Sequence, residues 1–140
     1  MARGIFLLRL GLAGIFLYAG VVKASASQEF ALALAPFTLL PVAWITPLAI
    51  TLAWTEICVG GLLLLPRFSK VGAGLAAALS LGFIALLTWA LSTGMIVNCG
   101  CFGGDETPSA AKMLLAIGRD FLILAAALAV LAGPAGPTRK

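Results

Sequence analysis

Long apolar stretches separated by short polar connections dominate this chain, and they predict four membrane-spanning helices. A spanning helix needs about 20 mostly apolar residues. The segments that meet this requirement cover residues 5–22, 42–65, 71–91 and 110–132, the second starting at Val42 or at Pro47. Thr107-Pro108 is typical of a helix start, because a capping hydroxyl precedes a proline suited to the first helical position. Gly133-Pro134 is typical of a helix end.

The connection after the first span, residues 24–46, is long for a loop and predicts a short additional helix. Ser27 is placed to cap a helix from Gln28 to Ala35, which Pro36 and Pro41 would end. Its apolar positions favour a location at the membrane interface, covering the outer end of the bundle. The predicted fold is therefore all-α: residues 1–140 form one domain, a polytopic four-helix bundle with a short interfacial helix in its first outer loop.

The amino-acid composition limits the classes of protein to which this chain can belong. Hydrophobic residues make up 62 % of the chain and charged residues 10 %, whereas soluble domains have about 25 % charged residues. The chain is therefore predicted to lie in a lipid bilayer. Its net charge of +4 comes from scattered basic residues without a basic patch, so nucleic-acid binding is not indicated. Histidine is absent, which excludes imidazole bases and imidazole metal ligands.

Basic residues near the spans predict the orientation, because Lys and Arg favour cytoplasmic connections. Both chain ends and the second connection share one side of a four-span protein and contain Arg3, Arg67, Lys70, Arg139 and Lys140. The other side has Lys23 and Lys112 together with Glu29, Asp105 and Glu106. We therefore expect an inner (plasma) membrane protein with both termini cytoplasmic. Ala24-Ser25-Ala26 resembles a signal cleavage site, but the long apolar run and Arg9 favour a retained span.

The third connection contains Cys99-Gly100-Cys101, and this pair is the main candidate for chemistry. The predicted orientation puts it in the periplasm or outside the cell, where disulfides persist. A bridge across such a small ring is expected to be strained and easily exchanged. Glycine at the middle position permits the required backbone. The interpretation is thiol–disulfide exchange by Cys99 and Cys101, with Cys58 in the second span read as a small core residue.

Other interpretations of the two thiols stay open. They are also compatible with unreactive cysteines, with a bridge that only shapes the loop, and with thiolate ligands for Cu(I) or Hg(II). Zinc is not indicated, because zinc sites usually use four ligands and the chain has neither histidine nor a second cysteine pair. No metal site is therefore predicted.

Ionisable residues inside the predicted spans form a second candidate site, because such residues are costly in lipid and usually pair inside a bundle. The set is Arg9, Glu56, Arg119 and Asp120. Glu56 and Arg119 lie at matching depth and are expected to pair, while Arg9 is long enough to reach towards Glu56 or Asp120. One interpretation is an ion network that fixes helix register. The other is a polar pocket that binds a quinone headgroup or relays protons.

Glycines and tryptophans in the predicted spans indicate how the helices pack and where the membrane surface lies. Glycines in the spans are expected to let helix backbones approach closely. They are Gly11, Gly14, Gly20, Gly60, Gly61, Gly72, Gly74 and Gly82. Trp44 and Trp89 are expected to lie at the outer interface.

Several of these residues form a familiar set. The pattern Arg9, Gly14, Gly20, Lys23, Glu56 and Gly60 resembles the small four-helix DoxX-type membrane proteins. Cys99-Gly100-Cys101-Phe102-Gly103 followed by Arg119-Asp120 is similar to the methylamine utilisation branch, MauE. This resemblance implies a role in maturing methylamine dehydrogenase, by forming disulfides or moving electrons, often beside a thioredoxin-like partner. It also implies an architecture like that of DsbB and vitamin K epoxide reductase, although this chain has no Cys-x-x-Cys.

The favoured hypothesis is a membrane thiol–disulfide protein that acts on an exported thioredoxin-like or disulfide-bonded partner, with Cys99 and Cys101 as catalytic residues and quinone as the candidate electron carrier. A quinone-linked oxidoreductase would fit this pattern. Two alternatives stay open: a Cu(I) or Hg(II) binding or transport protein, and an accessory subunit without chemistry.

Overall fold

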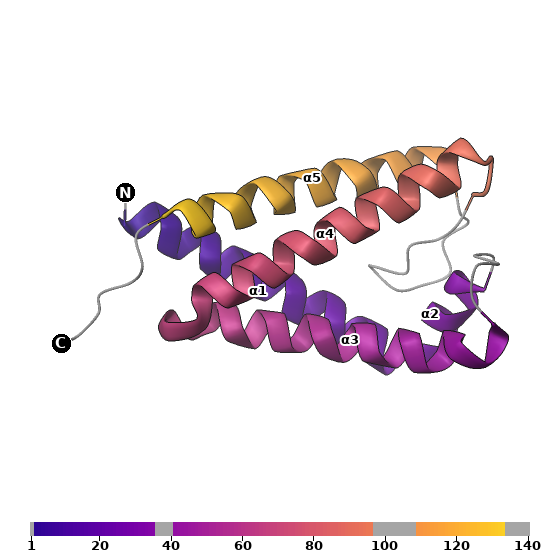
Figure 1. Ribbon diagram of the computed structural model, residues 1–140, viewed down its shortest axis with the longest axis horizontal. Helices are drawn as coiled ribbons and strands as arrows, with labels where there is room; N and C mark the ends of the chain where they lie inside the picture. The colour runs from indigo at the N-terminus through magenta and orange to yellow at the C-terminus, as the bar shows by residue number, and fades with distance from the viewer. Residues whose placement is uncertain (1, 36–40, 97–108, 134–140) are drawn as a thin grey trace.

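Apolar helices arranged as a bundle make up this protein. The computed structural model describes residues 2–35, 41–96 and 109–133, and Figure 1 shows their arrangement. The helices are α1 (Ala2–Ser25), α2 (Ser27–Leu34), α3 (Val42–Leu64), the 3₁₀ turn η1 (Pro66–Phe68), α4 (Ser69–Ser92) and α5 (Ala110–Ala132). The described residues contain no strand. Four of these helices are long and apolar enough to cross a membrane, which confirms the predicted all-α fold.

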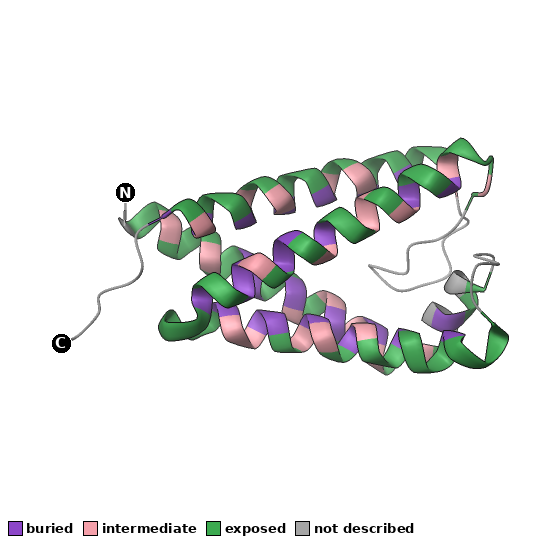
Figure 2. Ribbon diagram, in the orientation of Figure 1, coloured by how far each residue is buried: buried purple, intermediate pink, exposed green. Residues whose placement is uncertain are grey.

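Helix pairs build the bundle. α1 packs mainly on α3 and α5 packs mainly on α4, while α3 and α4 join the two pairs through the short turn η1. The start of α1, the η1 turn and the end of α5 lie at one end of the bundle, and α2 lies at the other end against α3 (Figure 1). Figure 2 shows buried positions on the inward faces of the long helices and exposed positions on the outward faces. Those outward faces carry the apolar side chains that contact lipid in a membrane protein.

Two starts are predicted for the second span, Val42 and Pro47. The helix begins at Val42, and Pro47 lies within it. Proline removes one backbone donor, and hydroxyl groups often supply local hydrogen bonds in such helices. Here the Thr51 hydroxyl donates to the Pro47 carbonyl oxygen at 2.7 Å, and the Thr55 hydroxyl donates to that of Thr51 at 2.7 Å. The earlier of the two expected starts is therefore the observed one.

Helix ends follow local hydrogen bonds, and the predicted cap of the short helix is wrong. Ser27 is the first residue of α2 instead of its cap, since Ala26 holds that position without a side-chain hydrogen bond. The cap of α5 is Ser109, whose Oγ accepts the Lys112 backbone N–H at 3.2 Å. Thr107-Pro108, the predicted start signal, lies outside the described residues. Gly133 does end α5 as predicted.

The end of α4 has a glycine-dependent geometry. The Gly94 N–H donates to the Leu91 carbonyl at 3.2 Å, and the Met95 N–H donates to the Ala90 carbonyl at 2.9 Å. This pair of bonds is the Schellman arrangement, which needs a left-handed residue after the helix. Gly94 adopts it with φ 77°, a conformation that costs little only in glycine.

Close helix packing uses only some of the predicted glycines. A Cβ on Gly20 would lie 2.6 Å from Ile57 Cγ1 and 3.0 Å from the Ala53 carbonyl oxygen, so α1 and α3 nearly touch there. Gly60 approaches Leu17 and Gly72 approaches Leu63 in the same way. The expectation is wrong for the other glycines, where a Cβ would meet nothing within 4 Å in the described part of the chain: Gly11, Gly14, Gly61, Gly74 and Gly82.

Candidate functional site

Charged side chains from three helices meet in one cavity of about 560 Å³ inside the bundle. Lys23 comes from α1, Glu56 from α3, and the neighbours Arg119 and Asp120 from α5. Each carboxylate lies on the buried face of its helix, because Glu56 and Asp120 continue the three- and four-residue spacing of buried positions in α3 and α5. The amphipathic pattern of each span therefore points its acidic residue inward.

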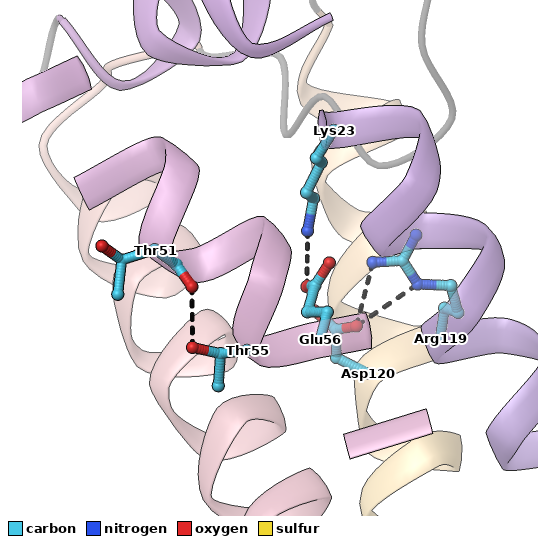
Figure 3. Close-up of polar contacts among 6 residues, drawn as sticks. All are labelled: Lys23, Thr51, Thr55, Glu56, Arg119 and Asp120. Carbon is cyan, nitrogen blue, oxygen red and sulfur yellow. Dashed lines mark hydrogen bonds and ion pairs between the residues drawn. The ribbon is translucent and has the colours of Figure 1, made fainter. Parts of the chain in front are cut away.

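Lys23 and Glu56 form a buried ion pair. Lys23 Nζ lies 2.6 Å from Glu56 Oε1, and the two side chains are 1 % and 3 % exposed. The same ammonium group lies 4.7 Å from the centroid of the Phe83 ring, a cation–π distance. Because both charges have lost their water, each depends on the other and on the surrounding dipoles to remain charged. Figure 3 shows Lys23 reaching from α1 towards Glu56.

Arg119 and Asp120 form the second pair, within α5. Arg119 Nη2 donates to Asp120 Oδ1 at 2.9 Å, and Nε donates to the same oxygen at 3.3 Å (Figure 3). The Arg119 side chain is 25 % exposed and that of Asp120 is 5 % exposed. Lys23 also attracts Asp120 electrostatically, so the two pairs act on each other across the cavity. The cavity thus contains two cations and two anions in balance.

Asp120 keeps one carboxylate oxygen available to a ligand. Its Oδ2 is buried and accepts no hydrogen bond from the residues that the structure describes. A buried acceptor without a donor is costly, and such atoms in proteins usually meet water or a ligand. The cavity is therefore suited to a guest that donates hydrogen bonds.

Comparison with known proteins identifies the family. The profile of the family described as methylamine utilisation protein MauE matches residues 1–133. The chain belongs to the MauE family. No curated protein and no solved structure matches the chain.

The charge cluster of this MauE family protein includes three of the residues that the sequence singles out. Glu56, Arg119 and Asp120 all line the cavity, so the expectation that they gather inside the bundle agrees with the structure. The shortest contacts join Glu56 to Lys23 and Arg119 to Asp120. The expected pairing of Glu56 with Arg119 stays a prediction.

Arg9 does not take the expected place in this MauE family protein. It is absent from the cavity lining, and its guanidinium lies over the ring of Phe6 in the same helix, 5.4 Å from the centroid. Within the described residues it forms no ion pair with Glu56 or Asp120. The reason is local: α1 directs Arg9 towards a ring one turn earlier, and this cation–π contact compensates part of its cost in lipid.

Lys23 lines the cavity, but the sequence analysis does not include it in the charged set, because it lies at the outer flank of the first span. Leu12, Ala13, Phe16, Gly20 and Lys23 are all buried and follow helical spacing along α1. Extending the apolar face of the first span by one more turn would have placed Lys23 inside the bundle. The need of Glu56 for a buried cation is the second signal that pointed to it.

No cysteine is among the described residues that line this cavity. Cys99 and Cys101, the predicted catalytic pair, lie outside the described residues. Cys58 lies on the exposed face of α3, so its interpretation as a core residue is wrong. The three- and four-residue spacing of the buried face passes through Glu56, Val59 and Gly60 and leaves Cys58 on the other side.

Proposed function

We propose that this MauE family protein is an integral membrane thiol–disulfide protein, which supports disulfide formation or electron transfer to exported proteins. The observation that carries the proposal is the Cys99-Gly100-Cys101 sequence between α4 and α5 of a chain that belongs to a methylamine utilisation family. Two thiols one residue apart form an exchangeable bridge more readily than a stable one. A structural bridge over so short a loop would add little stability.

Orientation supports the same proposal. The basic residues Arg3, Arg67 and Lys70 lie at the end of the bundle where α1 begins and α3 turns into α4. By the positive-inside rule this end faces the cytoplasm, so the connection from α4 to α5 faces the periplasm or the cell exterior. Disulfides persist in that compartment. We place the protein in the inner (plasma) membrane, with both termini cytoplasmic, the short helix α2 at the outer interface and an exported thioredoxin-like or disulfide-bonded protein as partner.

The chemistry is an exchange of two electrons. A partner thiolate attacks one sulfur of the Cys99–Cys101 disulfide, forming a mixed disulfide and releasing the other cysteine as a thiolate. The partner's second thiolate then attacks the mixed disulfide, so the partner leaves oxidised and both cysteines remain reduced. A lipid-soluble carrier that takes two electrons and two protons restores the bridge. The reverse sequence delivers electrons to the partner, and the relative redox potentials decide the direction.

Trapping the mixed disulfide tests the proposal. In a Cys58→Ala background with Cys101→Ser, the Cys99 thiolate can still attack a disulfide of the oxidised partner, but no Cys101 thiol remains to resolve the mixed disulfide, so acid-quenched cells should accumulate a disulfide-linked adduct. The wild-type pair should show a thiol pool that alkylates fully only after reduction. Cys99→Ser/Cys101→Ser is the matched control and should show neither signal. The proposal fails if the loop thiols alkylate fully without reduction and no adduct forms under any condition.

Two other results would replace the proposal. Stoichiometric Cu(I) or Hg(II) uptake that disappears in Cys99→Ser, without any disulfide, would indicate the soft-metal function. Full function of Cys99→Ser/Cys101→Ser in the host would indicate an accessory subunit.

A further inference from the structure

We infer that the cavity between α1, α3, α4 and α5 is a lipid-accessible site for a quinol, whose ring lies at the charged end and whose tail lies along the seam between α1 and α5. The inference rests on the proposed function for its role, since such a molecule would be the two-electron carrier. Its binding depends on the cavity alone.

The cavity can be reached from the bilayer between α1 and α5. α1 and α5 touch only lightly compared with the α1–α3 and α4–α5 pairs. Gly11 and Gly14 of α1 line the cavity, and a Cβ on either would meet no described atom within 4 Å. Ile15 and Tyr18 on the same wall are exposed on the outer face of the bundle. A ligand can therefore enter sideways from lipid, and a lipid-soluble molecule is the natural occupant at this depth.

The polar end of the cavity selects the headgroup. Asp120 is buried and lines the cavity, and its Oδ2 accepts no hydrogen bond from the described residues. A hydroxyl donor on the ligand would satisfy it, and a bond to a charged acceptor is stronger than one between neutral groups. Lys23 and Arg119 line the same space and can donate to ligand oxygens. The headgroup must therefore offer both donors and acceptors, as the two hydroxyls of a quinol do.

Aromatic walls favour a planar ring in this headgroup. Phe16 and Phe83 line the cavity next to the charged residues, and Phe83 already lies 4.7 Å from Lys23 Nζ. Aromatic rings prefer offset or edge-to-face contacts with other rings. A flexible polar headgroup, such as that of a phospholipid, would not use these walls as well as a flat ring does.

A second cavity supplies space for the tail. It has a volume of about 480 Å³ and shares Gly11, Ile15, Arg119 and Ile123 with the first, so the two are adjacent along α1 and α5. Apart from Arg119, its lining is glycine, alanine and aliphatic side chains. A ligand with a polar ring and an apolar chain fits this order of charged and apolar space, and both volumes lie in the usual range of ligand pockets.

The test measures binding of decylubiquinol to the purified full-length protein in phospholipid nanodiscs, by equilibrium partitioning with empty discs as reference. We expect saturable binding that excess phospholipid does not displace. Gly14→Leu fills the seam and should weaken binding tenfold or more. Gly82→Leu is the matched control, because Gly82 is also an exposed helical glycine with open space around it but does not line the cavity. It should bind as the wild type does.

A second variant tests the headgroup contact. Asp120→Asn removes the charged acceptor while keeping the shape, and it should weaken quinol binding about tenfold while affecting the oxidised quinone less, since quinone has no hydroxyl to donate. Circular dichroism confirms that both variants keep their helices. Equal binding by Gly14→Leu and Gly82→Leu, no saturable binding by the wild type, or displacement by phospholipid alone would overturn the inference.

The two proposals fail separately. Saturable quinol binding by Cys99→Ser/Cys101→Ser, with no thiol exchange in the wild type, would leave the cavity site standing and remove the redox function. Thiol exchange without quinol binding would leave the function standing and remove this site.

Discussion

Lys23 and Glu56 depend on each other because both are buried among apolar helices, with Nζ and Oε1 2.6 Å apart. Removing one partner from such a pair leaves the other charge in a low dielectric, which costs more than the pair contributed. Lys23→Met keeps the length of the side chain and removes its charge. We expect the free energy of unfolding to fall by about 3 kcal/mol, measured by denaturant titration in micelles with circular dichroism.

The double variant separates charge from packing. Lys23→Met/Glu56→Leu replaces the ion pair by apolar groups of similar size, which is often neutral or stabilising. It should recover most of the lost stability. If the double variant is as unstable as Lys23→Met alone, the loss comes from packing around Lys23 and not from an unbalanced charge.

The sequence predicts which charged residues gather inside the bundle when those residues lie far from the ends of an apolar span. Glu56, Arg119 and Asp120 lie well inside apolar runs, so their gathering in the bundle follows from the cost of charge in lipid. Lys23 lies near the end of α1, where the sequence alone does not say whether water reaches it. Arg9 shows the other limit, because its contact with the Phe6 ring depends on side-chain rotamers, which the residue pattern does not specify.

Gly20 and Gly14 lie on the same helix, α1, but differ in how closely other atoms approach them. A Cβ on Gly20 would meet Ala53 and Ile57 backbone atoms at 3.0 Å, whereas one on Gly14 would meet nothing within 4 Å in the described structure. Gly20→Ala should therefore lower the free energy of unfolding by about 1–3 kcal/mol, because α1 must move away from α3. Gly14→Ala should raise it by up to about 1 kcal/mol, because alanine favours the helix.

Thermal unfolding of the two alanine variants in the same micelles measures this difference. An equal shift for both would contradict the close approach of α1 and α3.

The sequence could not separate these glycines, because both lie in one apolar span. The helix ends differ from these positions, because Gly94 follows α4 in the left-handed conformation that favours glycine. Gly133 also ends α5, but with an extended backbone that does not require glycine. Helix starts were less certain, since several capping residues precede α5 and Ser109 holds the cap.

At the scale of the whole molecule, the bundle has two distinct ends. The start of α1, the η1 turn and the end of α5 gather at one end (Figure 1). The start of α3 and the end of α4 lie at the opposite end, with exposed Trp44 and Trp89 within one or two turns of the helix ends. Tryptophan favours the membrane–water boundary. We therefore expect this end of the bundle to lie at one membrane–water boundary, while the basic residues Arg3, Arg67 and Lys70 lie at the opposite end.

Impermeant thiol labelling of single-cysteine proteins tests this orientation without using the native cysteines. In a background of Cys58→Ala, Cys99→Ser and Cys101→Ser, Thr93→Cys reports the end of α4 and Phe68→Cys reports the η1 turn, two positions that are exposed and lie at opposite ends of the bundle. The basic residues Arg67 and Lys70 are kept, so the topological signal is unchanged. Thr93→Cys should react in intact cells, and Phe68→Cys should react only after the membrane is permeabilised. The reverse pattern would put the connection that carries Cys99 and Cys101 in the reducing cytoplasm, where a lasting disulfide is not expected, and the exchange chemistry would have no compartment in which to work.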